Sequence, residues 1–76
     1  MTPALLVPTT AKKLLRKLKK AGFIKLHQKG SHLALKNPRS GRIAVVPMHS
    51  GDIPAGTLHS IVVKQAGLSV KEFNSL

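Results

Sequence analysis

The sequence predicts an α+β fold in which a three-stranded antiparallel sheet carries two helices on one face, in the order α-β-β-β-α. Apolar residues recur at helical spacing near both ends of the chain, and they alternate with polar residues in the middle. Glycines and prolines separate these segments, as they do at turns. A length of 76 residues fits one domain, and an aromatic content of 3% requires an aliphatic core. We therefore expect residues 1–76 to form a single domain.

The chain should open with an extended arm over residues 1–8, because two prolines disfavour a helix or a central strand there. Thr9 or Thr10 can cap the helix that follows, since a threonine side chain accepts a bond from a free backbone N–H. Gly22 should end this helix. Its apolar stripe consists of Ala11, Leu14, Leu15 and Leu18.

Basic residues concentrate on the first helix and the segment after it. The chain has 13 Lys+Arg against 2 Asp+Glu, a formal net charge of +11, and 11 of those 13 lie between Lys12 and Arg42. Such a charge indicates a polyanionic partner. An ordinary solvated helix face is the alternative for this helix. A membrane surface is another, but the helix lacks the Trp and Phe anchors typical of that role.

A β-hairpin should follow over residues 24–36, where apolar and polar residues alternate. If Lys29 and Gly30 form a two-residue loop, His27 faces His32, and all four aliphatic side chains share one face. Those side chains are Ile24, Leu26, Leu33 and Leu35. Because Lys-Gly is a weaker hairpin signal than Asn-Gly, a β-bulge that separates the two histidines is the alternative.

The third strand should span Arg42–Val46, after a turn at residues 37–41 and before Pro47. It is apolar on both faces, whereas helices on one side of the sheet can cover only one of them. Part of this strand should therefore remain exposed. Such exposure indicates either a partner protein or a few scattered surface aliphatic residues.

A second helix should begin at Ala55 or Gly56, after an irregular loop, and end at Gly67. Residues 69–72 match a capping box, so a short terminal turn containing Phe73 should fold back on the domain. The buried stripe of the second helix consists of Leu58, Ile61, Val62 and Ala66.

Several classes of site are disfavoured. The chain has no cysteine, and its four histidines match no standard metal-ligand spacing, so we expect neither a metal nor another cofactor. Residues 1–7 are apolar but too few to span a bilayer, and they lack the pattern of a secretory signal. We therefore expect a soluble cytoplasmic protein without membrane contact.

Four short motifs occur in order along the chain. They are Lys20-Ala21-Gly22-Phe23, Lys29-Gly30-Ser31-His32, Val46-Pro47-Met48-His49, and Gly56-Thr57-Leu58 continued through Ile61 to Lys64-Gln65-Ala66-Gly67-Leu68. Together they resemble the HicA family of toxins from bacterial and archaeal toxin–antitoxin pairs, over nearly the whole chain. The resemblance implies a double-stranded-RNA-binding-domain-like fold over residues 9–74 and a translation-independent, metal-free mRNA endonuclease. It also implies a HicB-type acidic antitoxin as partner. A homo-oligomer and a hetero-oligomer with the antitoxin are the alternative assemblies.

The same resemblance implies that His32 is the single catalytic histidine, because it is the histidine of the family's Gly-Ser-His motif. Many relatives carry a second histidine where this chain has Leu33, which suggests that the second one is dispensable. They usually carry an arginine at the position of His27, so the resemblance gives His27 no role.

RNA cleavage needs little from a protein, because the 2′-OH of RNA is an internal nucleophile. A histidine side chain, whose ordinary pKa is about 6.5, can move the proton, and cations can stabilise the charge on the phosphate. Beside His32 as base or acid, we expect His27 and His49 as candidate auxiliary residues, with His49 otherwise fixing its loop. Candidate phosphate contacts are Lys29, the backbone of Gly30 and Ser31, and Lys12, Arg16, Lys19 and Lys20. The alternatives are a non-catalytic nucleic-acid-binding module and a subunit that serves chiefly for protein interaction.

Overall fold

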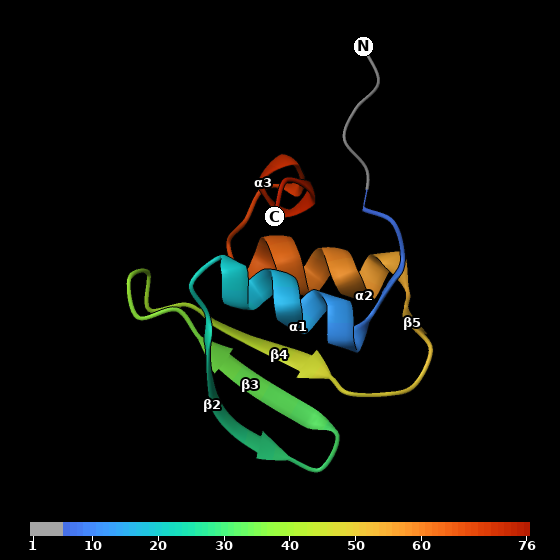
Figure 1. Cartoon of the computed structure of the whole chain (residues 1–76), viewed down its shortest axis with the longest axis horizontal. Coiled ribbons are helices and arrows are strands. Elements are labelled where there is room, and N and C mark those ends of the chain that lie inside the picture. The colour runs from blue at the N-terminus through green and yellow to red at the C-terminus, as the bar shows by residue number, and fades with distance from the viewer. Residues whose placement is uncertain (1–5) are drawn as a thin grey trace.

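A computed structural model describes residues 6–76 and confirms the α+β architecture (Figure 1). Three antiparallel strands form one sheet in the order β2-β3-β4. Helix α1 and the helix formed by α2 and η1 both lie on one face of this sheet, and α3 lies on the far side of that helical layer (Figure 1). These elements are α1 (Ala11–Lys20), β2 (Ile24–Lys29), β3 (His32–Lys36), β4 (Ile43–Pro47), α2 (Ala55–His59), η1 (Ser60–Gln65) and α3 (Val70–Asn74).

Helix α1 begins and ends where the sequence predicts. The hydroxyl of Thr10 accepts a 3.2 Å hydrogen bond from the backbone N–H of Lys13, which caps the helix. Gly22 has φ of +103°, a conformation that favours glycine, and the chain leaves the helix there. Leu14 and Leu18 are fully buried, whereas Leu15 is half-buried. The remaining positions of the helix carry its cations.

A second, two-stranded sheet is absent from the sequence prediction. Strand β1 (Thr9–Thr10) pairs antiparallel with β5 (Asp52–Ile53), so that Thr10 lies opposite Asp52. β5 falls inside the segment expected to be an irregular loop. Leu6–Pro8 have no regular structure, and the rest of the expected N-terminal arm lies outside the described residues.

The predicted hairpin register is wrong. The two-residue loop is Gly30-Ser31, and Lys29 lies directly opposite His32. Gly30 has φ of +59°, and placing glycine first in a two-residue loop is the preference of type II′ turns. The Gly-Ser pair is thus the stronger turn signal, and it shifts the strands relative to the expected pairing.

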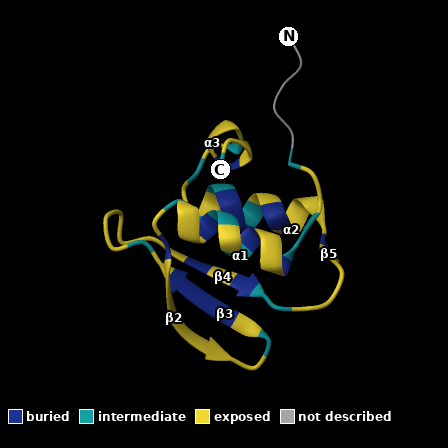
Figure 2. Ribbon diagram, viewed as in Figure 1, coloured by how far each residue is buried: buried dark blue, intermediate teal, exposed yellow. Residues whose placement is uncertain are grey.

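A β-bulge, and not the shifted loop, moves the aliphatic side chains of β2 away from the core. The register changes between Lys25 and His27, which leaves a β-bulge at Leu26. Leu33 and Leu35 are buried as expected, but Ile24 is 56% exposed and Leu26 is 50% exposed. In Figure 2 all of β2 is exposed, whereas the adjacent β3 is buried along most of its length.

The second helix has the predicted bounds but not a uniform geometry. It starts at Ala55 in α-helical form and continues from Ser60 as the π-helical stretch η1, while all four predicted stripe residues are buried. Ser69 and Glu72 form the predicted capping box at the start of α3. Phe73 is 3% exposed, which confirms that the terminal turn folds back.

The core lies between the sheet and the helical layer. Its buried side chains are Ala11, Leu14, Leu18, Phe23, Leu33, Leu35, Ala44, Val46, Ile53, Leu58, Ile61, Val62, Ala66 and Phe73. No helix within residues 6–76 covers the outer face of the sheet (Figure 1). As predicted, β4 is apolar on both faces, with Ile43 47% and Val45 37% exposed.

Candidate active site and basic surface

The hairpin places His32 at the exposed start of β3, directly after the Gly30-Ser31 loop. Its neighbours across the sheet are Lys29 in β2 and Pro47 in β4. These three residues form one row on the outer face of the sheet, since residues directly opposite each other in a sheet project to the same side. The candidate catalytic histidine and the candidate phosphate contact Lys29 are therefore immediate neighbours.

His49 is the histidine whose ring lies against that of His32. The two ring centroids are 6.4 Å apart and the ring planes make an angle of 81°, an edge-to-face arrangement. His49 belongs to the loop after β4, so the two rings come from different segments of the chain. Both side chains are exposed and open to a ligand.

His27 is not directly opposite His32, contrary to the predicted register. It pairs with Ala34, so His27 and His32 are only diagonal neighbours on the outer face. The cause is again the Gly30-Ser31 loop, which gives Lys29 the position that the sequence prediction gave to His27. Of the two candidate auxiliary histidines, the structure brings His49 into ring contact with His32.

Two adjoining hollows run between the end of β4 and the helix α2–η1. The first, of about 330 Å³, is lined by His32 and by the hydroxyl and amide side chains of the helix. The second, of about 260 Å³, is lined by His49 and the loop around it. Pro47 and Thr57 line both hollows, so together they form one groove that contains both histidines. We call this the histidine groove; its lining residues are His32, Val45, Pro47, His49, Gly51, Asp52, Ile53, Pro54, Thr57, Ser60, Ile61 and Gln65.

The polar residues that the helix contributes to the groove were missed by the sequence analysis. Thr57, Ser60 and Gln65 follow one another at three and five residues, along the flank beside the buried stripe. A polar flank next to a buried helical stripe is the signal that could have indicated them. Without the strand register, however, nothing showed that this flank faces His32.

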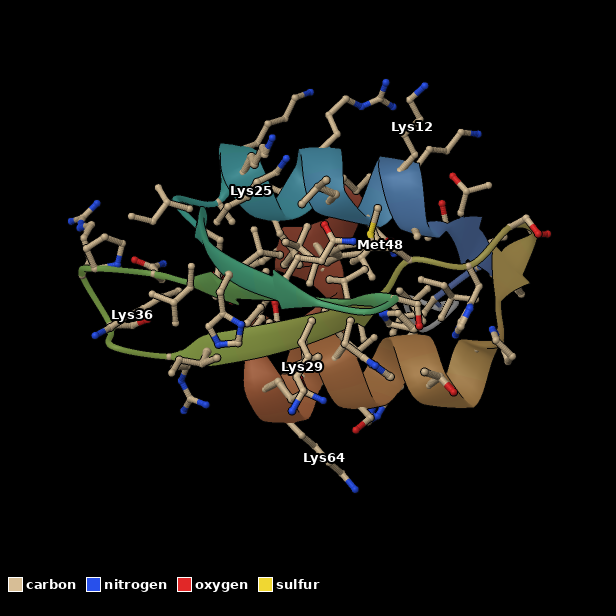
Figure 3. The ribbon with its side chains drawn as sticks, turned by 90° about the horizontal axis from the view of Figure 1, so that it is seen from below. Lys12, Lys25, Lys29, Lys36, Met48 and Lys64 are labelled. Atoms are coloured by element: carbon tan, nitrogen blue, oxygen red, sulfur yellow. The ribbon has the colours of Figure 1, made fainter. Side chains whose placement is uncertain are left out.

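The cations of α1 form a separate surface. Their side chains enclose a hollow of about 830 Å³ that shares no lining residue with the histidine groove. Figure 3 shows Lys12 on α1 and Lys64 on η1 projecting from opposite sides of the molecule. The structure thus brings only Lys29 among the candidate phosphate-binding side chains beside His32. We call the other surface the α1 basic face; its lining residues are Thr10, Lys12, Lys13, Leu15, Arg16, Lys19 and Lys20.

One cation of α1 does not belong to this face. The ammonium group of Lys17 donates a 3.3 Å hydrogen bond to the carbonyl of Phe73 and lies 4.6 Å from the centre of its ring. Both contacts hold α3 against α1. Lys17 is therefore engaged within the fold, whereas its neighbours Lys13 and Lys20 are exposed.

The chain has only two carboxylate side chains to set against these cations. Glu72 accepts the backbone N–H of Ser69 in the capping box, and Asp52 lies in β5 beside the His49 hollow. Within residues 6–76, no group of three or more His, Asp or Glu side chains lies together in a way that could hold a metal ion. In the same range, no helix is long and apolar enough to cross a membrane.

The fold and these two surfaces define a small, strongly basic domain with the α-β-β-β-α layout of double-stranded-RNA-binding domains and a two-histidine groove. A family model described as the HicA toxin of bacterial toxin–antitoxin systems matches residues 11–68. The chain therefore belongs to the HicA toxin family, as its motifs indicated. No curated protein matches the sequence.

Proposed function

We propose that this protein is the toxin of a type II toxin–antitoxin pair and that it cleaves mRNA as a metal-independent endoribonuclease, with His32 moving the proton. The observation that supports this most is the position of His32, exposed in the histidine groove with Lys29 as its direct cross-strand neighbour. Membership of the HicA toxin family supports the toxin role. An enzyme acting on mRNA in this way works in the cytoplasm.

The chemistry requires a proton transfer and a fixed positive charge. His32 takes the proton from the 2′-OH of the ribose, and the 2′-oxygen attacks the adjacent phosphorus. General base catalysis of this kind contributes a factor of roughly 10²–10⁴ in rate. The ammonium group of Lys29 and the backbone N–H groups of the Gly30-Ser31 turn stabilise the negative charge that develops on the phosphate.

The α1 basic face supplies most of the grip on RNA in this proposal. Five of its seven lining residues are cations, and the only aromatic residues, Phe23 and Phe73, are buried and cannot stack on bases. Binding should therefore be dominated by backbone phosphates, with strong salt dependence and little sequence selectivity. Because this face lies apart from the groove, one RNA strand that contacts both must follow the surface from α1 to the sheet.

The deciding experiment compares His32→Ala with a matched control, His59→Ala, since His59 is an exposed histidine of α2 that does not line the groove. The wild-type protein and the control should cleave an unstructured RNA, whereas His32→Ala should lose a factor of about 10²–10⁴ in rate. RNA affinity and the melting temperature should stay close to wild type in both variants. Full cleavage by His32→Ala would contradict the proposed role.

Binding by the α1 basic face can be tested separately. Replacing Lys12 and Arg16 by alanine should weaken RNA binding and lower the slope of log K against log salt by about 0.7 for each lost phosphate contact. The double change Lys64→Ala and Lys71→Ala removes the same charge outside the α1 basic face and should leave both quantities unchanged. Equal effects of the two changes would show that only net charge matters.

A non-catalytic nucleic-acid-binding module is the second candidate function, and the separation of the α1 basic face from the histidine groove favours it. Such a module needs the cations and the fold but not His32. It predicts RNA binding without cleavage by highly purified protein, and an unchanged affinity in His32→Ala. The two functions therefore differ in the cleavage assay on the wild-type protein.

The outer face of the sheet is the surface that we propose for a HicB-type antitoxin. Ile24, Lys36 and Ile43 form one row across the three strands, and Val45 lies in the next row, so exposed aliphatic side chains are mixed with a cation. A second copy of this chain, with its own charge of +11, would be repelled, whereas an acidic partner would be attracted. A partner seated there would also reach His32, which ends the same face.

Ile43→Asp tests this surface, because it places a negative charge among the exposed aliphatic residues without touching the core. Co-expressed with the proposed HicB-type antitoxin, the variant should fail to co-purify, while Val7→Asp, at a 73% exposed position outside the sheet, should co-purify normally. Retention of the partner by Ile43→Asp would refute the docking surface. That result would not bear on the proposed nuclease activity, which the cleavage assay tests separately.

A further inference from the structure

We propose that His49 is the second proton-transferring residue of this site and that it protonates the leaving 5′-oxygen while His32 acts on the 2′-OH. This inference rests on the proposed ribonuclease function and adds to it a second catalytic residue with a defined role. It starts from one observation, the edge-to-face contact between the two rings.

Displacement at phosphorus places the attacking and leaving oxygens roughly in line, on opposite sides of the phosphorus. A base that has just taken the proton from one side is badly placed to protonate the oxygen on the other side. Two groups, each within a hydrogen-bond reach of about 2.6–3.2 Å, can serve both oxygens at once. Ring centroids 6.4 Å apart place both imidazoles within reach of one phosphodiester group that lies in the groove against the two rings.

The backbone fixes the distance between the two histidines. The N–H of Met48 donates a hydrogen bond to the carbonyl of Ser31, and these two residues immediately precede His49 and His32. Pro47 is also directly opposite His32 in the sheet. The rings are therefore held by the ladder of β3 and β4 and by its one-residue continuation into the loop.

The other end of the His49 loop is fastened too. Gly51 turns the chain with φ of +87°, and the next residue, Asp52, pairs with Thr10 in the small sheet. The loop is thus tied at both ends within a few residues of His49. A loop held in this way can present a catalytic side chain at a fixed position, as a proton donor requires.

The shape of the groove agrees with a substrate that runs along both rings. The hollow beside His32 and the hollow beside His49 meet at Pro47 and Thr57. A phosphodiester at this junction would have one nucleoside on each side. Thr57 lines both hollows, and its hydroxyl is a hydrogen-bond donor that a phosphate oxygen there can use.

The proposed step balances as follows. His32 accepts the 2′-OH proton, the bond from the 2′-oxygen to phosphorus forms, and the bond from phosphorus to the 5′-oxygen breaks. The 5′-oxygen leaves with the proton of His49. The products are a 2′,3′-cyclic phosphate and a 5′-hydroxyl end, and exchange with water returns both histidines to their starting states.

A one-atom change in the substrate tests the role of His49. Two oligoribonucleotides of identical sequence are compared, one normal and one with sulfur in place of the bridging 5′-oxygen at the mapped cleavage site. A thiolate leaves without a proton, so it needs no general acid. His49→Ala should slow cleavage of the normal RNA by about 10²–10⁴-fold but should cleave the sulfur-substituted RNA within about tenfold of the wild-type rate.

His32→Ala is the matched variant and should be slow on both RNAs, because the 2′-OH still has to lose its proton. An equal loss on both RNAs in His49→Ala would overturn the inference, and so would unchanged cleavage of the normal RNA. His49→Gln keeps a hydrogen-bonding side chain but cannot deliver a proton, so recovery of normal cleavage in that variant would also overturn it. Circular dichroism and melting temperature should show that each variant is folded.

The pH profile gives an independent readout. Cleavage of normal RNA by the wild-type protein should be bell-shaped, because one histidine must be neutral and the other protonated. His49→Ala should lose the fall in rate on the alkaline side, which arises from deprotonation of the acid. If the wild-type protein cleaves no RNA, the proposed function itself fails; if it cleaves and the sulfur substitution rescues nothing, only the role of His49 fails.

Discussion

The side-chain oxygen of Gln65 accepts a 2.8 Å hydrogen bond from the backbone N–H of Val45. Val45 is in β4, an edge strand of the sheet, and Gln65 is the last residue of η1. An edge strand presents unpaired N–H groups that can pair with another chain, so this bond both protects the edge and holds the helix beside the histidine groove.

Loss of this bond should cost stability without disrupting the fold. Gln65→Ala removes the acceptor, and we expect the free energy of unfolding to fall by about 0.5–1.5 kcal/mol. Gln65→Glu keeps an acceptor and should restore most of the loss, while its charge in the groove should weaken RNA binding. Urea unfolding of both variants checks this, and equal stability of Gln65→Ala and wild type would show that the bond contributes nothing.

The conformation of Gly30 gives a second prediction. At φ of +59°, an alanine is strained even though nothing lies within 4 Å of the added Cβ, and we expect Gly30→Ala to cost about 1–3 kcal/mol. Gly56→Ala is the matched change, because Gly56 lies within α2 with equally free space and no such φ. It should be neutral or stabilising by up to about 1 kcal/mol. Thermal unfolding distinguishes the two, and equal effects would contradict the turn assignment.

The hairpin register can be tested by comparing Leu33 with Leu26. Leu33 is 3% exposed in the core, so Leu33→Ala should destabilise the domain by about 2–5 kcal/mol. Leu26 is 50% exposed at the bulge, and Leu26→Ala should stay within about 0.5 kcal/mol of wild type. Similar losses in chemical denaturation would instead support the register in which both leucines share the buried face.

The cations of α1 should divide into a structural one and RNA-binding ones. Lys17→Ala removes the hydrogen bond and the ring contact to Phe73, and it should lower stability by about 1–2 kcal/mol. Lys13→Ala, at an exposed position of the α1 basic face, should leave stability unchanged and weaken RNA binding. Parallel measurements of melting temperature and RNA affinity check this division, and a reversed order would refute it.

The sequence was sufficient for the elements whose signals are local. Thr10 caps α1, Gly22 ends it, and Ser69 caps α3, each through contacts within a few residues. The buried stripes of the helices and the apolar strand β4 were also predicted correctly, because apolar residues repeat at the period of the helix or strand that they belong to. The order of these elements then constrained the fold class strongly.

Two kinds of feature could not be predicted from the sequence. One is the choice between two overlapping turn signals, and the other is any contact between residues far apart in the chain. Lys29-Gly30 and Gly30-Ser31 are overlapping candidate loops, and one residue of difference decides which side chain faces His32. The alternation of Ile24 with Leu26 suggested a buried face, but Phe23 fills the core there instead. The contact between His32 and His49 joins residues 17 positions apart and depends on the β3–β4 register. Periodicity within one strand cannot reveal such a contact.

The small sheet of β1 and β5 joins the first turn of α1 to the loop that carries His49. Any shortening of the chain that removes Thr9 and Thr10 also takes away the hydrogen-bonding partner of Asp52 and Ile53 and the cap of the helix. An inactive N-terminal truncation would therefore not identify RNA contacts in the missing segment. In this protein a deletion at the N-terminus cannot distinguish the loss of RNA contacts from the loss of the anchor that holds the His49 loop. Point substitutions are therefore the safer way to locate its RNA contacts.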